Sequence, residues 1–166
     1  MNKKIILKVA VIAIIILAVV ALIIFGINWR KNAPVRLVEK YLTETENGNI
    51  DKMKKMFDFK GWYAWIDSDE DFDEFKKIYD DVSDKDIDGK LDNWGYGSKE
   101  DYLKSIMYGD NNVSYKISNE PSIKKLGKKL YEVKTKIKVD DDGYKFTETW
   151  KFIIYKDKII YMTDLD

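Results

Sequence analysis

The sequence predicts an α+β protein in which an N-terminal apolar helix precedes one domain of helices followed by an antiparallel sheet of about four strands. Three observations lead to this prediction. Residues 9–27 form an uninterrupted apolar run, apolar residues recur every three or four positions in the next part of the chain, and the recurrence changes to every second position after Gly109. The three-four spacing is typical of helices with one buried side, and the two-residue alternation is typical of strands with one exposed face.

The apolar run predicts a transmembrane signal-anchor helix over residues 9–27. At ~1.5 Å of rise per residue the run covers roughly 28 Å, close to the ~30 Å thickness of the hydrocarbon core of a bilayer. A cleaved secretory signal peptide is the alternative, since Lys3, Lys4 and Lys8 form a basic region before the run. The run is longer than the ~7 to 15 apolar residues of a typical signal peptide, which favours a retained anchor.

These features predict a single-pass protein of the cell membrane with the lipid bilayer as a partner. Four segments are expected: a basic tail over 1–8, the span over 9–27, a juxtamembrane linker over 28–34 and the domain over 35–166. A short polar tail before the span is typical of a signal-anchor with its domain on the extracellular side, although the positive charges flanking the span are nearly balanced. The chain has no cysteine, which excludes a lipid-modified N-terminus and any stabilising disulfide.

Apolar spacing predicts four helices at the start of the domain. They are expected from Pro34 to Thr45, ended by Asn47-Gly48; from Asp51, as N-cap, to an end at Gly61; from Phe72 to Tyr79; and from Ser98, as N-cap, to Met107. The segment 83–97 is rich in Asp and Gly and is expected to be a loop. The aromatic side chains of Trp62, Tyr63 and Trp65 are expected in the core and not in a ligand site.

The second half of the domain predicts strands. From Leu130 to Val139, apolar residues and Thr alternate with charged residues, as a strand with one wet face requires. Asp140-Asp141-Asp142-Gly143 predicts a tight turn, and Tyr144–Tyr155 is the expected returning strand. Two more strands are expected over Val113–Ile117 and Ile159–Met162, with a tight turn before the latter.

The residues YLTETENGNIDKMKKMF, where one helix leads into the next, and the closing segment TETWKFIIYKDKIIYMTDLD resemble the NTF2-like (cystatin-like, cone-shaped) superfamily, particularly its membrane-anchored bacterial members. The resemblance covers most of residues 35–166. It implies a curved sheet wrapped around the helices, with a concave pocket or a dimerisation face. The layout of a span before such a domain is also similar to the bridge component of type IV secretion and conjugation machines, although the Asn-Pro-x-Gly motif of many such proteins is missing.

The composition argues against an enzyme. Enzymatic members of that superfamily usually place an Asp in the cone, often with a His or Tyr, and this chain has no histidine. Its absence removes the usual general base near neutral pH, Ser-His-Asp systems and histidine-ligated zinc sites. An Asp-Tyr pair could still perform acid-base chemistry, but no pair stands out among the many Asp and Tyr residues. We therefore expect no catalytic residues and no cofactor-binding residues.

One motif suggests a weak calcium site. Asp84, Asp86 and Asp88, followed by Gly89, match the first half of an EF-hand loop, and Asp92 fits its ninth position. Gly95 stands where the loop requires a bidentate Glu. The alternative is an Asp-rich surface segment that has this spacing through composition alone.

Charge is distributed unevenly although the formal net charge is zero. Residues 67–92 contain twelve acids and four lysines, whereas residues 113–139 contain eight lysines and two acids, so the domain is expected to be an electrostatic dipole. Seven of these lysines could contact lipid headgroups, a wall polymer or an acidic patch of a partner, or form an ordinary solvated sheet face: Lys124, Lys125, Lys128, Lys129, Lys134, Lys136 and Lys138. We expect a membrane-anchored extracytoplasmic binding domain without catalytic activity. The alternative is a structural subunit of a cell-envelope or conjugation complex that contacts a protein partner or forms a homodimer. Nucleic acid is not expected as a partner.

Overall fold

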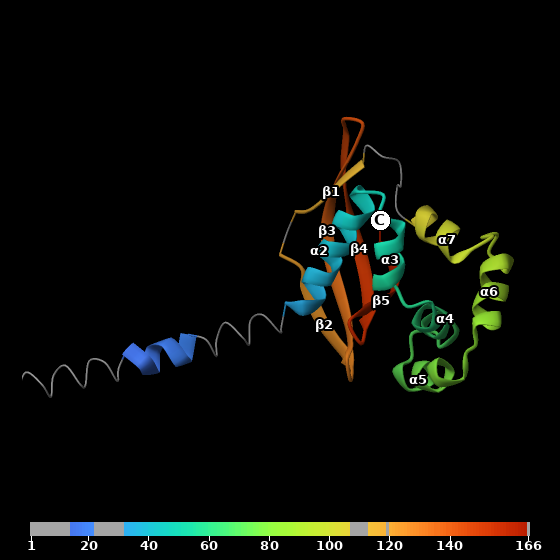
Figure 1. Ribbon diagram of the computed structural model, residues 1–166, viewed down its shortest axis with the longest axis horizontal. Helices are drawn as coiled ribbons and strands as arrows, with labels where there is room; N and C mark the ends of the chain where they lie inside the picture. Colours follow the sequence, from blue (N-terminus) through green and yellow to red (C-terminus); the bar gives the residue numbers. More distant parts are fainter. Residues whose placement is uncertain (1–13, 22–31, 107–112, 119, 166) are drawn as a thin grey trace, which may run out of the picture. The chain divides into compact units, whose positions relative to one another are not determined.

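The computed structural model of the chain describes residues 14–21, 32–106, 113–118 and 120–165. The chain divides into two compact units, Met1–Ala33 and Pro34–Asp166. The second unit is an α+β domain in which helices precede an antiparallel sheet (Figure 1). The domain is therefore α+β, as predicted.

The predicted transmembrane helix over 9–27 needs correction. Within the described ranges, no helix is both long enough and apolar enough to cross a membrane. In the apolar run, helix is described over residues 14–21, and eight helical residues rise only about 12 Å. The remaining positions of the run, 9–13 and 22–27, lie outside the described residues.

The first two helices of the domain agree with the sequence. Helix α2 spans Ala33–Glu46 and buries Val38, Tyr41 and Leu42 along one side. Gly48 follows with a φ of 61°, which glycine adopts without strain, and α3 begins at once over Ile50–Met56. The predicted turn between two helices is confirmed, but Asn49 and not Asp51 is the N-cap of α3, and α3 ends at Met56, well before Gly61.

Gly61 does not end a helix as predicted. Helix α4 spans Phe59–Asp67, and Gly61 lies inside it. A Cβ atom at this position would lie 2.4 Å from Cγ2 of Ile160 in the sheet. The glycine is thus required by the close approach of a helix to a strand. Helix α5 spans Phe72–Asp81 and is capped by the side chain of Asp71, in agreement with the predicted third helix.

The loop predicted over 83–97 is wrong. Helix α6 spans Asp84–Asn93, and the Ser83 and Asp86 side chains form a reciprocal capping box at its start. Ile87 and Leu91, four residues apart, are its buried side chains. Helix α7 spans Lys99–Ile106, and its predicted last residue, Met107, lies outside the described residues.

Among the described residues the sheet has five strands, where about four were predicted. The strands are β1 (Val113–Ile117), β2 (Ser122–Gly127), β3 (Leu130–Asp141), β4 (Tyr144–Tyr155) and β5 (Lys158–Asp164). The order is β1-β3-β4-β5, and the unpredicted β2 also pairs with β3, beyond the end of β1. The turns Asp142-Gly143 and Lys156-Asp157 both have two residues at positive φ, as tight type I′ hairpins require.

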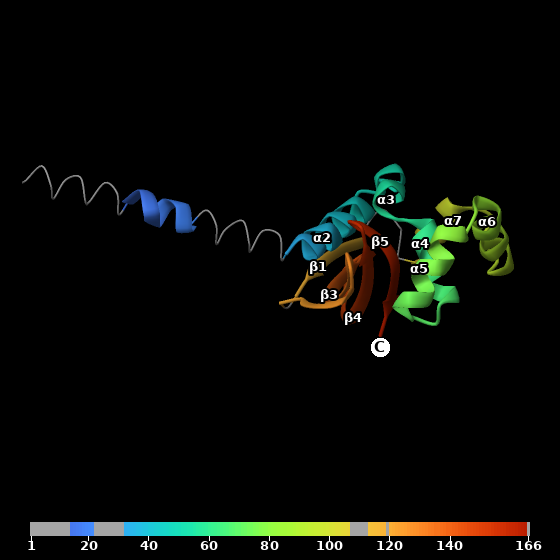
Figure 2. The same ribbon diagram turned by 90° about the horizontal axis from the view of Figure 1, so that it is seen from below.

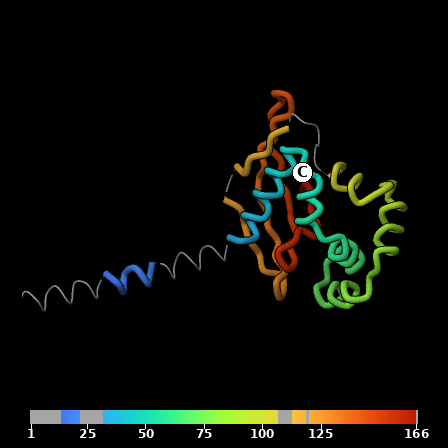
Figure 3. The backbone as a smooth tube through the Cα atoms, viewed as in Figure 1, coloured from blue at the N-terminus to red at the C-terminus, as the bar shows by residue number. Residues whose placement is uncertain are grey.

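The inner face of the curved sheet carries the main core. Helices α2 and α3 lie over this face, as Figure 2 shows, and α2 packs Val38, Tyr41 and Leu42 against buried strand residues such as Ile137 and Phe152. Helices α4 to α7 follow one another in an arc beside the sheet (Figure 3). Helices α4 and α5 form a second core with the opposite, outer face, near the β4–β5 turn.

Candidate functional site

The outer face of the sheet presents a row of lysines that the strand alternation places together. On β3 the odd positions from Val133 to Val139 are buried and the even positions from Lys134 to Lys138 are exposed. The residues of β1, β2 and β4 that pair with the even positions of β3 share this outer face. We call the following set the lysine face: Lys116, Lys124, Lys134, Lys136, Lys138, Lys145 and Lys151.

The strand register sets these lysines in rows. Lys116 of β1 lies directly opposite Lys138 of β3, which lies opposite Thr147 of β4. The next row consists of Ser114, Asp140 and Lys145. Directly opposed residues of an antiparallel pair have Cα atoms about 4.5 to 5.5 Å apart, and like charges so placed are destabilising. The row that holds Lys116 and Lys138 is therefore a local accumulation of positive charge.

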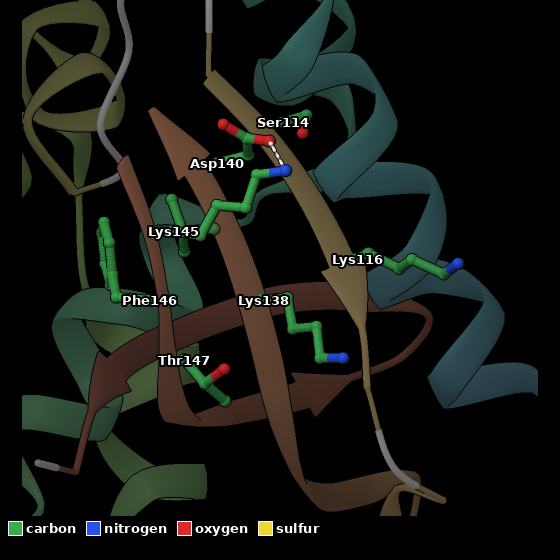
Figure 4. A pocket seen from close by; sticks show the side chains of 8 residues that line it. Ser114, Lys116, Lys138, Asp140, Lys145, Phe146 and Thr147 are labelled. Atoms are coloured by element: carbon green, nitrogen blue, oxygen red, sulfur yellow. Dashed lines mark ion pairs between the residues drawn. The ribbon is translucent and has the colours of Figure 1, made fainter. Parts of the chain in front are cut away.

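The two rows border a hollow of about 390 Å³. Lining side chains come from three neighbouring strands, and Figure 4 shows Lys116, Lys138 and Lys145 together at this end of the face. Ser114 and Thr147 add hydroxyl groups, which donate and accept hydrogen bonds. The side chains of Val139 and Phe146, which pair with each other across β3 and β4, lie on the inner face of the sheet, in or against the main core. Ammonium and hydroxyl donors of this kind suit an anionic group.

Carboxylates neutralise only part of the lysine face. The Lys145 ammonium lies 3.2 Å from Asp140 Oδ2, and the Lys134 ammonium lies 3.5 Å from Glu132 Oε1. Within the part of the chain that the structure describes, no carboxylate lies within 4 Å of the Lys116 or Lys138 ammonium. The hollow therefore carries uncompensated positive charge.

The carboxylate of the hollow has a structural role. Asp140 accepts a hydrogen bond of 3.0 Å from the Gly143 backbone N–H in addition to its ion pair with Lys145. Both contacts hold the β3–β4 turn. Asp140 thus helps to position the hairpin that forms one wall of the hollow.

An Asp-Tyr pair does occur, away from the hollow. The Tyr79 hydroxyl donates to Asp58 Oδ2 at 3.0 Å, and Asp58 Oδ1 also accepts from the Lys60 backbone N–H as the N-cap of α4. Burial, followed by the charge of Asp58, raises the pKa of Tyr79 above its ordinary value. The phenol therefore stays protonated near neutral pH and joins α5 to the start of α4.

The four aspartates of the predicted calcium loop lie on α6. Asp84 and Asp88 reach the Lys99 ammonium at 2.8 and 3.7 Å, and hydrogen bonds with Ser83 hold the pKa of Asp86 below its usual range. Asp84 and Asp92 are two helical turns apart, about 12 Å along the axis, whereas calcium ligands lie about 2.3 to 2.6 Å from the ion. Among the described residues, no three acidic, His or Cys side chains come together as metal ligands.

Two of the aromatic side chains singled out in the sequence lie in the core. Trp62 and Trp65 are buried, whereas Tyr63 is half-buried. The Lys90 ammonium lies over the Tyr63 ring, 4.7 Å from the ring centroid. The core prediction is therefore confirmed for both tryptophans. The sequence indicated the lysines of β2, of β3 and of the turn between them as a candidate surface, but not their neighbours Lys116 and Lys145. The Asp142-Gly143 turn sets the β3–β4 register and is the signal that could have located Lys145, whereas the register of β1, which places Lys116, has no local signal in the sequence.

The comparisons with known proteins give no relative from which a role could be transferred. No family model, curated protein or solved structure matches this chain.

Proposed function

We propose that the domain acts by binding and not by catalysis, and that the lysine face is its binding surface for an anionic partner. The observation that carries this proposal is the row of Lys116 and Lys138. Two like charges opposite each other without a neutralising carboxylate cost stability. A bound anion would offset this cost.

The chemistry of the hollow supports binding over catalysis. Lysines, Ser114 and Thr147 can orient an anion through charge and hydrogen bonds. Asp140, the carboxylate that lines the hollow, is engaged by Lys145 and by the Gly143 N–H, and a general base must be free to take a proton. The absence of histidine from the sequence points the same way.

The shape of the lysine face favours an extended or repeating anion over a single small one. Along β3, Lys134, Lys136 and Lys138 project every second residue, about 6.8 Å apart. An acidic chain with carboxylates at a similar spacing would meet several ammonium groups together. The NTF2-like resemblance and the role as a subunit of a larger complex both remain predictions. The subunit role is favoured by Tyr144, which is 74% exposed at the tip of the β3–β4 hairpin beside the hollow.

A charge-reversal experiment on the full chain tests this proposal. Fluorescent poly-L-glutamate serves as the probe, and Lys116→Glu with Lys138→Glu is the test variant. We expect the Kd to rise about tenfold or more, because two exposed attractions of up to about 1 kcal/mol each become repulsions. The control reverses two other exposed lysines, Lys40 and Lys55 of α2 and α3. Equal affinity of the test variant and the wild type, or an equal loss in the control, would contradict the proposal.

A further inference from the structure

We infer that the anionic partner of the lysine face is a second copy of this chain, bound face to face about a two-fold axis. This inference rests on the proposed function, since it names the partner of the same surface. It follows from an acidic segment that stands at the opposite end of the face from the hollow.

The acidic segment joins α4 to α5. Residues 69–74 contain five acids and no base, and all five acidic side chains are exposed. We call these residues the acidic turn. Asp69 and Glu70 have φ values of 46° and 65°, so the chain bends sharply here, and buried Ser68 holds the bend through a 2.9 Å hydrogen bond to the Trp65 carbonyl.

The acidic turn borders the lysine face directly. Glu70 Oε1 lies 2.8 Å from the Lys151 ammonium, and Lys151 is a member of the lysine face. Behind the turn, Phe75 packs edge-on against Tyr155 of β4, with ring centroids 5.0 Å apart. Lys151 and Lys145 are six residues apart on one strand, about 20 Å. One face therefore carries acids at one end and the basic hollow at the other.

Each end of the face carries charged side chains that form no ion pair within one copy. In the described part of the chain, no ammonium lies within 4 Å of a carboxylate of Asp73 or Glu74, just as no carboxylate lies near Lys116 or Lys138. The distance along the sheet prevents the two ends of one copy from meeting. A second copy can bring them together.

The two ends of this face are complementary to each other when a second copy is turned by 180°, whereas the lysines between the ends then face the same lysines of the other copy, which weakens the contact. The acidic turn of one copy then lies over the hollow of the other, and the symmetry repeats the contact at the far end. Two-fold dimers use one patch on both subunits in this way and close without further growth. A zero net charge on the chain removes the overall repulsion that opposes self-association. Exposed ion pairs are individually weak and screened by salt, so we expect a dimer that dissociates on dilution.

Sedimentation velocity on the full chain tests the inference across a concentration series. The basic-end variant is Lys116→Glu with Lys138→Glu, and the acidic-end variant is Asp73→Lys with Glu74→Lys. We expect a dimer for the wild type, monomers for each variant alone, and a dimer again when the two variants are mixed, because each reversed end then meets its opposite. The control with Lys40 and Lys55 reversed should dimerise like the wild type. At about 1 M NaCl, where the Debye length is about 3 Å, the dimer should be lost.

Circular dichroism verifies the fold of each variant, and Asp73→Asn with Glu74→Gln provides a milder acidic-end variant that should weaken the dimer in the same direction. A wild type that is monomeric throughout, or a dimer that survives both reversals, would overturn the inference. Growth beyond a dimer would overturn the closed two-fold arrangement. Poly-L-glutamate binding distinguishes the two proposals. If the wild type is monomeric, and the basic-end variant binds poly-L-glutamate more weakly than the wild type does, the proposed function stands and the inference fails.

Discussion

Replacing Gly61 by alanine tests how closely α4 packs against the sheet. The new Cβ would lie 2.4 Å from Cγ2 and 3.0 Å from Cβ of Ile160, whereas non-bonded carbon atoms are most stable about 3.5 to 4.0 Å apart. Ile160 is fully buried, and its Cβ cannot rotate away, so the helix must move by several tenths of an ångström or more.

The expected free energy has two contributions of opposite sign. Alanine in place of glycine inside a helix stabilises by about 1 kcal/mol, and overpacking a filled core costs about 1 to 3 kcal/mol. Because the clash involves the branched Cβ of a buried side chain, we place its cost at the upper end. The net expectation is a loss of about 1 to 2 kcal/mol, or a melting temperature lower by roughly 2 to 8 °C for a domain of this size.

The chain offers a matched control in the middle of α6. A Cβ on Gly89 would meet no atom within 4 Å, so Gly89→Ala should give only the helix-forming gain and raise the melting temperature by roughly 2 to 4 °C. Ile160→Leu removes Cγ2, since leucine branches one atom further out, and should recover part of the loss in the Gly61→Ala background. Thermal melts by circular dichroism measure all three. A Gly61→Ala variant as stable as the wild type would refute this account of the packing.

Three further expectations concern pH, an edge hydrogen bond and calcium. Burial raises the pKa of Tyr41 and Tyr102 in the folded chain, so the unfolded chain loses these protons first, and stability should fall above about pH 10 by about 1.4 kcal/mol per pH unit for each tyrosine. Urea titrations that give the same stability at pH 9 and pH 11 would contradict this. The Glu46 carboxylate accepts a hydrogen bond from the Tyr115 backbone N–H on the outer edge of β1. Glu46→Ala should therefore speed amide hydrogen exchange at Tyr115 and lower the free energy of unfolding by about 1 kcal/mol. Glu46→Gln keeps an acceptor oxygen at this position and serves as the control. Since the four aspartates of α6 do not converge, we expect equal melting temperatures in about 1 mM calcium and in chelator; a clear rise with calcium would show a site that binds the folded state.

The sequence predicts well those elements whose apolar period is unambiguous. The alternation in β3 and β4 and the Asp142-Gly143 turn define a hairpin through neighbouring residues alone. Helix α6 escapes prediction because its Asp and Gly content resembles that of a loop, and only two of its side chains are buried. Ser83 and Asp86, three residues apart, are nevertheless a helix-start signal, which the loop-like composition outweighs.

Strand β2 and the role of Gly61 also escape prediction, for two other reasons. The first four residues of β2, Ser122 to Lys125, are all exposed. The strand therefore lacks the alternation of buried and exposed residues that would distinguish it from a coil, and only its pairing with β3 makes it a strand. Gly61 suggests a helix end because glycine commonly ends helices. Its actual role depends on Ile160, far along the chain in β5, and no local pattern carries that information.

One part of the candidate site can be predicted from neighbouring residues, and the other part depends on contacts between distant segments of the chain. The two-residue turn at Asp142-Gly143 places Lys138 opposite Thr147 and Asp140 opposite Lys145, so this half of the hollow follows from the sequence alone. Lys116 cannot be placed in that way, because β1 reaches β3 only after β2 has intervened, and a shift of one residue would turn Lys116 to the buried face. The buried Val113 and Tyr115 prevent that shift. The core of the sheet therefore determines where the charge of the lysine face accumulates, and a variant that changes the register of β1 should weaken anion binding without removing a single lysine.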